Sequence, residues 1–168
     1  FLMLPNAQAY CIVSPHGEQL EQEFAGHPAA AYVKLTGRLG DEELVTAYSG
    51  AVALLYPSLY EGFGLPPLEG MACGCPVITS TAPALLEVCA DAAIHVRPDD
   101  CTALASAMIS LFSRDIRARY IRRGHERATV FSWQRSASQL LRAISGRLGS
   151  QMGLDNIIWE RHTKDKQQ

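Results

Sequence analysis

Short apolar runs alternate with segments of helical periodicity along the first hundred residues. Each run is rich in branched or aromatic residues, is too short for a helix, and is bounded by Gly, Pro, Asp or Ser. The runs predict strands at Ala9 to Ser14, Ala31 to Thr36, Ala51 to Tyr56, Pro76 to Thr79 and Ala92 to Val96. Because helical segments separate the strands, we expect an α/β fold, a Rossmann-like parallel sheet with helices on both faces.

The segments between and after these strands predict the helices. Asp41 is expected to be the N-cap of one of them, with Glu42 and Glu43 in its first turn, where acidic groups suit the helix dipole. We expect one domain over residues 1–147, followed by a polar tail or an extra helix over residues 148–168. The predicted helices are Glu18 to Ala25, Asp41 to Ser49, Pro66 to Cys73, Pro83 to Cys89, Asp99 to Phe112, Arg114 to Thr129 and Trp133 to Arg147.

Composition narrows the class of protein. With 48% hydrophobic and 19% charged residues, the balance is that of a globular domain. The formal net charge is -2, so there is no surplus of positive charge for a nucleic-acid backbone, and we expect no nucleic-acid partner. The five cysteines are odd in number and mostly lie in apolar runs, which favours a reducing, cytosolic setting. No Cys or His pair accompanies Cys73 and Cys75 at metal-ligand spacing, so no metal site is predicted.

The segment Tyr56 to Ile78, written YPSLYEGFGLPPLEGMACGCPVI, carries the candidate chemistry. A strand ends, a glycine-bearing loop follows, and a helix begins at a proline pair. Gly62 and Gly64 permit positive φ and a close backbone approach, so the N–H groups from Phe63 to Leu65 can point at an anion. The loop also lies at the carboxyl end of a parallel strand, where open α/β sheets bind ligands. We expect a phosphate there.

Two carboxylates flank this expected anion site. Glu61 precedes the loop, and Glu69 is expected in the first turn of the helix. Carboxylates repel phosphate but accept hydrogen bonds from vicinal hydroxyls, and a nucleotide sugar has hydroxyls on both sides of its diphosphate. The alternative is that Glu61 is an exposed loop acid, Glu69 an acid that complements the helix dipole, and the glycines a simple turn.

The same residues resemble glycosyltransferase family 4 of the GT-B architecture, whose nucleotide-binding domain carries a Glu, seven residues, Glu signature. Here that signature reads EGFGLPPLE. Alone the spacing is a weak pattern, but the similarity extends through TGRLGDEELVTAYSGAVALLYPS before it and GMACGCPVITS after it. FSW at 131 to 133 is similar to the opening of that domain's last helix. The resemblance covers about Ala9 to Arg147 and implies the C-terminal, donor-binding half of such an enzyme.

The resemblance also implies roles for individual residues. Glu61 would contact hydroxyls of the transferred hexose and orient it, which makes it the expected catalytic residue, although not a nucleophile. Glu69 would hold the ribose, and the main chain near Gly37 and Leu39 would lie beside the base. The family works with retention at the anomeric carbon and needs no essential metal or other cofactor. The backbone N–H groups expected to meet the diphosphate belong to Gly62, Phe63, Gly64 and Leu65.

Other parts of such an enzyme are expected upstream of Phe1. In the family, an Arg and a Lys from the first strand and helix of this domain meet the phosphates, and Lys34 and Arg38 belong to a different element. The acceptor-binding N-terminal domain is likewise expected upstream, so this piece alone should have weak activity or none. The expected location is cytoplasmic. Only the upstream domain is expected to associate with a membrane, which would place the full-length protein peripherally at the inner membrane face. The sequence leaves the base, the sugar, the acceptor and the oligomeric state open.

Two other functions stay in view. A nucleotide-sugar-binding module without catalysis would use the same loop. A dinucleotide oxidoreductase is disfavoured, because no G-x-G-x-x-G follows a strand. His16, after the first strand, is a further candidate at the ligand edge. A run of arginines predicts a solvated or interdomain helix face, namely Arg114, Arg117, Arg119, Arg122, Arg123 and Arg127.

Overall fold

The computed structural model describes residues 2–3, 9–12, 22 and 25–148. It divides into two compact units, Phe1–Val130 and Phe131–Gln168. The described part of the second unit holds helix α7, Trp133–Leu148, close to its predicted bounds. Most of the helix predicted at residues 18–25, and nearly all of the predicted tail, lie outside the described residues, and the domain boundary at residue 147 stays a prediction.

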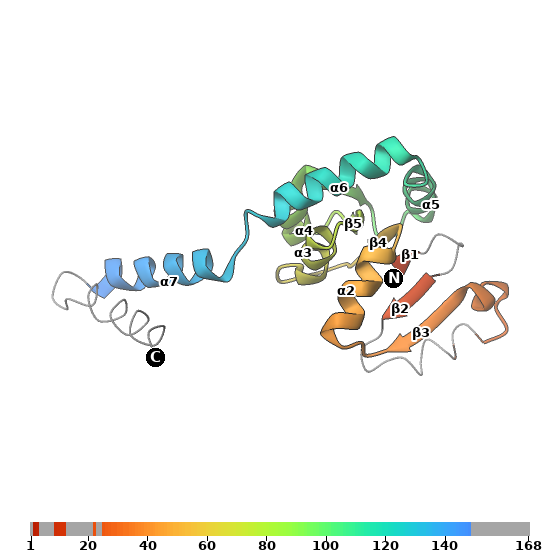
Figure 1. Cartoon of the computed structure of the whole chain (residues 1–168), viewed down its shortest axis with the longest axis horizontal. Coiled ribbons are helices and arrows are strands. Elements are labelled where there is room, and N and C mark those ends of the chain that lie inside the picture. The colour runs from red at the N-terminus through yellow and green to blue at the C-terminus, as the bar shows by residue number, and fades with distance from the viewer. Residues whose placement is uncertain (1, 4–8, 13–21, 23–24, 149–168) are drawn as a thin grey trace. The chain divides into compact units, whose positions relative to one another are not determined.

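The first unit is built on a mixed sheet whose strand order is β3-β2-β1-β4-β5-β6 (Figure 1). β2 is parallel to β3, and β4, β5 and β6 are parallel to one another, whereas β1 is antiparallel to both β2 and β4. The carboxyl ends of β2 to β6 therefore share one edge of the sheet. The strands are β1 Leu2–Met3, β2 Ala9–Ile12, β3 Val33–Gly37, β4 Ala53–Tyr56, β5 Val77–Ser80 and β6 Ala93–Val96.

Among the described residues, five strands match the predicted runs, and the two-residue β1 was not predicted. It is too short to show a hydrophobic period. The expectation of a wholly parallel sheet is correct for β2 to β6 and wrong for β1. The helices of the first unit also match: α2 Asp41–Gly50, α3 Leu65–Ala72, α4 Pro83–Cys89, α5 Cys101–Ser110 and α6 Arg114–Ala128, with 3-10 turns η1 Pro28–Tyr32 and η2 Ala90–Ala92.

The N-cap of α2 is Gly40 and not, as expected, Asp41, which is the first helical residue. The N–H of Gly40 donates to Oε2 of Glu43 at 2.8 Å. The acidic side chains still occupy the first turn, where they complement the helix dipole. The cap therefore comes from the backbone of a glycine and a carboxylate three residues later.

Helices cover both faces of the sheet, as the sequence predicts. On one face Leu55 and Ile78 form a buried cluster with Ala107 of α5 and with Leu111, the residue that caps this helix at its carboxyl end. On the other, α3 lies so close to β4 that a Cβ on Gly70 would be 3.2 Å from Cδ2 of Leu54. Every residue of β5 is buried, which is typical of a central parallel strand.

Helix α6 runs along α3 and reaches η2 beyond the end of α4 (Figure 1). The expected face is solvated or interdomain, but three of its arginines, Arg117, Arg123 and Arg127, donate to main-chain carbonyls within the first unit. The bonds of Arg117 and of Arg127 to Val88 are partly buried, so these two side chains are not simply solvated. Arg127 reaches the carbonyl oxygens of Val88 at 2.8 Å and Glu87 at 2.7 Å. These carbonyls lie in the last turn of α4, where helix acceptors lack intrahelical partners. The spacing of the arginines predicts which face of α6 they share, but it does not predict the main-chain carbonyl groups that they contact.

Candidate functional site

The predicted loop lies between β4 and α3, at the shared carboxyl edge of the sheet. Two hydroxyls from the end of β5 fix the last residue of β4 and the beginning of the loop. Oγ1 of Thr79 donates to the carbonyl oxygen of Tyr56 at 3.2 Å, and Oγ of Ser80 donates to the carbonyl oxygen of Ser58. Both Thr79 and Ser80 are fully buried, and these bonds satisfy hydroxyls that would otherwise be desolvated without a partner. The loop therefore leaves the sheet along a fixed path.

Gly64 sets the turn from this loop into α3. It is the N-cap of the helix, with φ 114° and ψ 52°. A Cβ on Gly64 would lie 2.7 Å from Cδ2 of Leu85, so the positive φ and this close contact both disfavour a side chain here. Of the two glycines that permit a positive φ, Gly64 has one. Gly62 has none, and an added Cβ there would meet no atom within 4 Å.

The amino terminus of α3 presents main-chain donors at this turn. Helix N-termini carry N–H groups without intrahelical partners, and Pro66 and Pro67 have no N–H to contribute. The first-turn donors are therefore concentrated at Gly64 and Leu65. The side chains of Phe63 and Leu65 are 41% and 47% exposed. This arrangement suits an anion that approaches the end of the helix dipole.

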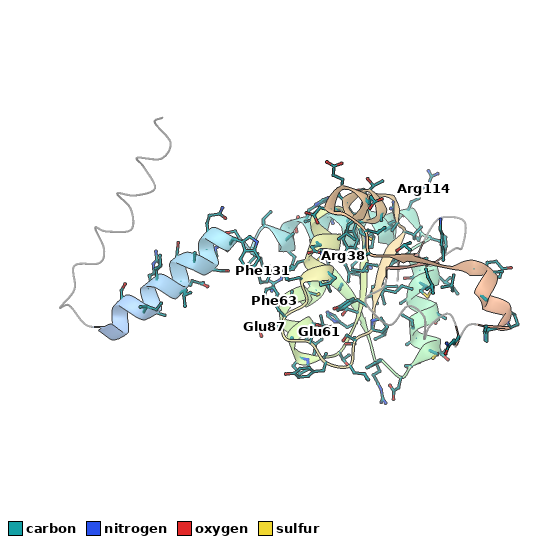
Figure 2. All side chains as sticks on the ribbon, turned by 90° about the horizontal axis from the view of Figure 1, so that it is seen from below. Arg38, Glu61, Phe63, Glu87, Arg114 and Phe131 are labelled. Atoms are coloured by element: carbon teal, nitrogen blue, oxygen red, sulfur yellow. The ribbon has the colours of Figure 1, made fainter. Side chains whose placement is uncertain are left out.

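Glu61 is held by the last residue of β4. The hydroxyl of Tyr56 donates to Oε1 of Glu61 at 2.7 Å, within the ordinary range for such a bond. Glu61 is half-buried, and Figure 2 labels it at the same end of the first unit as Phe63. One carboxylate oxygen of Glu61 is thus bonded to this tyrosine, and no residue that the structure describes bonds the other.

Glu69 has a similar but weaker partner. The hydroxyl of Tyr48, in α2, donates to its Oε2 at 3.4 Å, beyond the usual distance between two oxygens. Glu69 is exposed and is the fifth residue of α3, so the expectation that it lies in the first turn is wrong. The reason is that the helix begins at Leu65, before the proline pair, and not at the pair itself. Glu69 is therefore one residue further from the start of the helix than expected, just beyond the first turn.

The tyrosines that touch these carboxylates stay protonated at neutral pH. Burial first, and then the neighbouring carboxylates, raise the pKa of Tyr48 and of Tyr56 above the ordinary value. Burial also raises the pKa of the Cys75 thiol to about 12 and that of Cys89 to about 11. Both thiols are therefore protonated and poorly nucleophilic at neutral pH. Among the described residues, no group of three or more His, Cys, Asp or Glu side chains could hold a metal ion.

The segment expected beside the base follows β3, at the same sheet edge. Gly37 ends this strand with φ 66°, and Leu39 is half-buried. A hollow of about 610 Å³ opens between β3 and α2, and Leu39 lines it while Glu61 and Glu69 do not. The strand order puts β2 and β1 between β3 and β4. The structure thus places Gly37 and Leu39 on the edge that carries the loop, and His16 lies outside the described residues.

Sequence reasoning found the carboxylates but not the side chains that hold them. Tyr48 and Tyr56 come from a helix and a strand, and Thr79 and Ser80 from the next strand, so no local pattern joins them to the loop. The sequence signal that could have indicated Tyr56, Thr79 and Ser80 is a polar residue at the carboxyl end of a predicted strand. His95, expected to be core or edge, is half-buried, and its Nε2 lies 2.7 Å from the carbonyl oxygen of Ala90.

Residues 5–114 match the model of the family described as Glycosyl transferases group 1. Because this match takes in more than half of the chain, the fold and loop described above are those of a glycosyltransferase domain. The chain belongs to the group 1 glycosyltransferases.

Two of the curated relatives of the chain are mannosyltransferases. It is 37% identical to O-antigen chain mannosyltransferase B of Escherichia coli over 113 residues, which cover 67% of this chain and 30% of that protein. It is 34% identical to the GDP-mannose-dependent alpha-(1-6)-phosphatidylinositol dimannoside mannosyltransferase of Mycobacterium tuberculosis over 138 residues, 77% of this chain and 33% of that protein. The chain thus spans about a third of the length of these two relatives.

Solved GT-B structures have the same fold. Sucrose-phosphate synthase from Thermosynechococcus elongatus matches with a TM-score of 0.65 and 30% identity, over 80% of this chain and 37% of that one. The Anabaena protein HepE in complex with UDP-glucose matches with a TM-score of 0.72 and 18% identity, over 84% of this chain and 42% of that one. The expected α/β fold is confirmed. In the part of the chain that the structure describes, no helix has the length and apolarity needed to cross a membrane.

Proposed function

We propose that this chain is the donor-binding half of a retaining hexosyltransferase that takes a hexose from a nucleoside diphosphate sugar and passes it to an acceptor. The observation that carries the proposal is the pair of tyrosine-held carboxylates, Glu61 and Glu69, on either side of the amino terminus of α3. Main-chain N–H groups that can bind an anion lie between two carboxylates that can accept hydrogen bonds from hydroxyls. This order matches a diphosphate between a hexose and a ribose. Membership of the glycosyltransferase family supports the same assignment.

The donor proposed for the first trial is GDP-mannose. The supporting observation is that the Escherichia coli and Mycobacterium tuberculosis relatives are mannosyltransferases, and the name of the second specifies GDP-mannose. UDP-glucose, which accompanies the structural neighbour HepE, is the alternative donor. The acceptor is proposed to bind an N-terminal domain that the chain does not include, and this domain would also mediate any membrane association.

In this proposal each part of the loop has one task. Backbone N–H groups from Gly62 to Leu65 bind the diphosphate, Glu69 holds the ribose, and Glu61 orients the hexose. The main chain at Gly37 and Leu39 lies beside the base. Catalysis then rests on orientation and on stabilising the charge that develops on the leaving diphosphate, with no protein nucleophile, metal or other cofactor.

The cytoplasm is the proposed location of this chemistry. Four described cysteines are free thiols, which supports a reducing compartment, and Cys75 and Cys89 among them are buried. Nucleic acid is not a proposed partner. The partner is the nucleotide sugar.

A calorimetric titration of the complete protein with nucleotide sugars tests the proposal. We expect GDP-mannose to bind and UDP-glucose and ADP-glucose to bind more weakly, with GDP retaining most of the affinity, because the diphosphate and ribose contacts remain. Absence of binding by all three donors would contradict the donor site. Binding without transfer to any acceptor would instead favour the non-catalytic binding module.

A further inference from the structure

Tyr56 is anchored at both its main chain and its ring. Its carbonyl oxygen accepts a hydrogen bond from buried Thr79, and it pairs in register with that residue in the sheet. The ring is half-buried, and its hydroxyl lies 2.7 Å from Oε1 of Glu61. A side chain fixed in this way at the end of a central strand can act as a rigid support for a group on the loop beyond it.

Glu61 has little else to fix it. It follows Tyr60, whose side chain is 85% exposed, and precedes Gly62, which has no atom within 4 Å of a Cβ position. A glutamate in such a loop would sample several rotamers in the absence of a partner. A short hydrogen bond from a hydroxyl to an ionised carboxylate is among the stronger hydrogen bonds in proteins. The Tyr56 hydroxyl therefore selects one orientation of the Glu61 side chain.

The second pair, Tyr48 and Glu69, differs from Tyr56 and Glu61 in its distance and in the backbone that carries the carboxylate. Tyr48 is 3.4 Å from Glu69, and Glu69 projects from α3, whose backbone already limits its direction. Glu61 projects from a loop and has the shorter bond. The carboxylate without helical support thus has the stronger side-chain partner, as expected if the direction of Glu61 matters to the reaction.

We infer that Tyr56 is a positioning residue for hexose transfer: its hydroxyl bonds Oε1 of Glu61 and leaves Oε2 directed to the hydroxyls of the donor hexose. This inference rests on the proposed function. It assigns Tyr56 no contact with the nucleoside diphosphate. Loss of the hydroxyl would therefore affect the orientation of the hexose and leave the binding of the nucleotide unchanged.

The test is Tyr56→Phe in the complete protein, with Tyr60→Phe as the matched control. Tyr60 lies on the same loop, and its ring is exposed. Its main-chain carbonyl oxygen accepts a hydrogen bond from Oγ of Ser58, and this bond does not involve the Tyr60 hydroxyl. We expect Tyr56→Phe to lower kcat for the donor about tenfold, as for loss of one strong hydrogen bond, with the Kd for GDP within about twofold of wild type. Tyr60→Phe should keep kcat within about twofold.

A double variant separates positioning from folding. If Tyr56 acts through Glu61, adding Tyr56→Phe to Glu61→Ala should change kcat less than about twofold. An additive tenfold loss, an unchanged kcat in Tyr56→Phe alone, or equal losses in GDP and donor binding would overturn the inference. Failure of the wild-type protein to bind GDP or any nucleotide sugar would instead overturn the proposed function, and this inference with it. A thermal midpoint for Tyr56→Phe within a few degrees of wild type makes the kinetic comparison valid.

Discussion

Replacing Glu61 or Glu69 by Ala in the complete protein is expected to reduce hexose transfer by well over tenfold while the fold stays intact. The two losses should differ in kind. Glu61→Ala removes a contact that orients the reacting hexose, so the loss should fall mainly on kcat. Glu69→Ala removes a contact to the ribose, away from the reacting bond, and should raise the KM for the donor more than it lowers kcat.

Steady-state kinetics with a saturating acceptor checks this pair. Glu126→Ala is a suitable control, because Glu126 is an exposed acid on α6 whose carboxylate belongs to no part of the proposed site. All three variants should unfold close to the wild-type temperature. Near-normal transfer in both Glu61→Ala and Glu69→Ala would show that the two carboxylates are ordinary surface acids.

Replacing Gly64 by Ala is expected to be the most disruptive single-methyl change in the loop. A non-glycine residue at φ 114° is strained by about 1 to 3 kcal/mol. The added Cβ would also lie 2.7 Å from Cδ2 of buried Leu85, and such overpacking costs roughly 1 to 3 kcal/mol more. Because Gly64 precedes α3 directly, relief of this strain would also shift the main-chain donors of the anion site.

Gly62→Ala supplies the matched control for that prediction. Gly62 is in the same loop but has no positive φ, and a Cβ there would meet nothing within 4 Å. Its midpoint of unfolding by urea should stay near that of the wild type, with a change in stability of about 0.5 kcal/mol or less. Equal shifts of the two midpoints would contradict the account of Gly64.

The sequence predicted the parts of the fold that depend on local pattern. Strands such as Val77–Ser80 and Ala93–Val96 appear as short apolar runs, and α4 begins at the proline that marks it. The direction of β1 was not predictable, since two residues have no period and the pairing of Leu2–Met3 is decided by tertiary contacts. The same holds for Arg127, whose carbonyl partners belong to another helix.

In the candidate site too, the features set by local sequence were predictable and those set by tertiary contacts were not. Glu61, Glu69 and the glycine loop stand together in the sequence, and their residue types indicated the chemistry. Tyr48 and Tyr56 approach the carboxylates only after α2, β4 and α3 have packed, so no spacing rule connects them. Conformation also depends on the neighbours: Gly62 and Gly64 look alike in sequence, yet only Gly64 has the positive φ. Local chemistry was thus predictable, and the side-chain contacts that orient it were not.

The most direct test of the donor site is the position at which a nucleoside diphosphate binds. The complete protein can be labelled with ¹⁵N in glycine and leucine only, and its amide signals followed during titration with GDP, and with UDP in parallel. We predict that the largest shifts belong to the N–H groups of Gly62, Gly64 and Leu65, with smaller shifts at Gly37 and Leu39. Shifts confined to other glycines and leucines, with these five unchanged at saturating nucleotide, would contradict the assignment of the loop as the donor site.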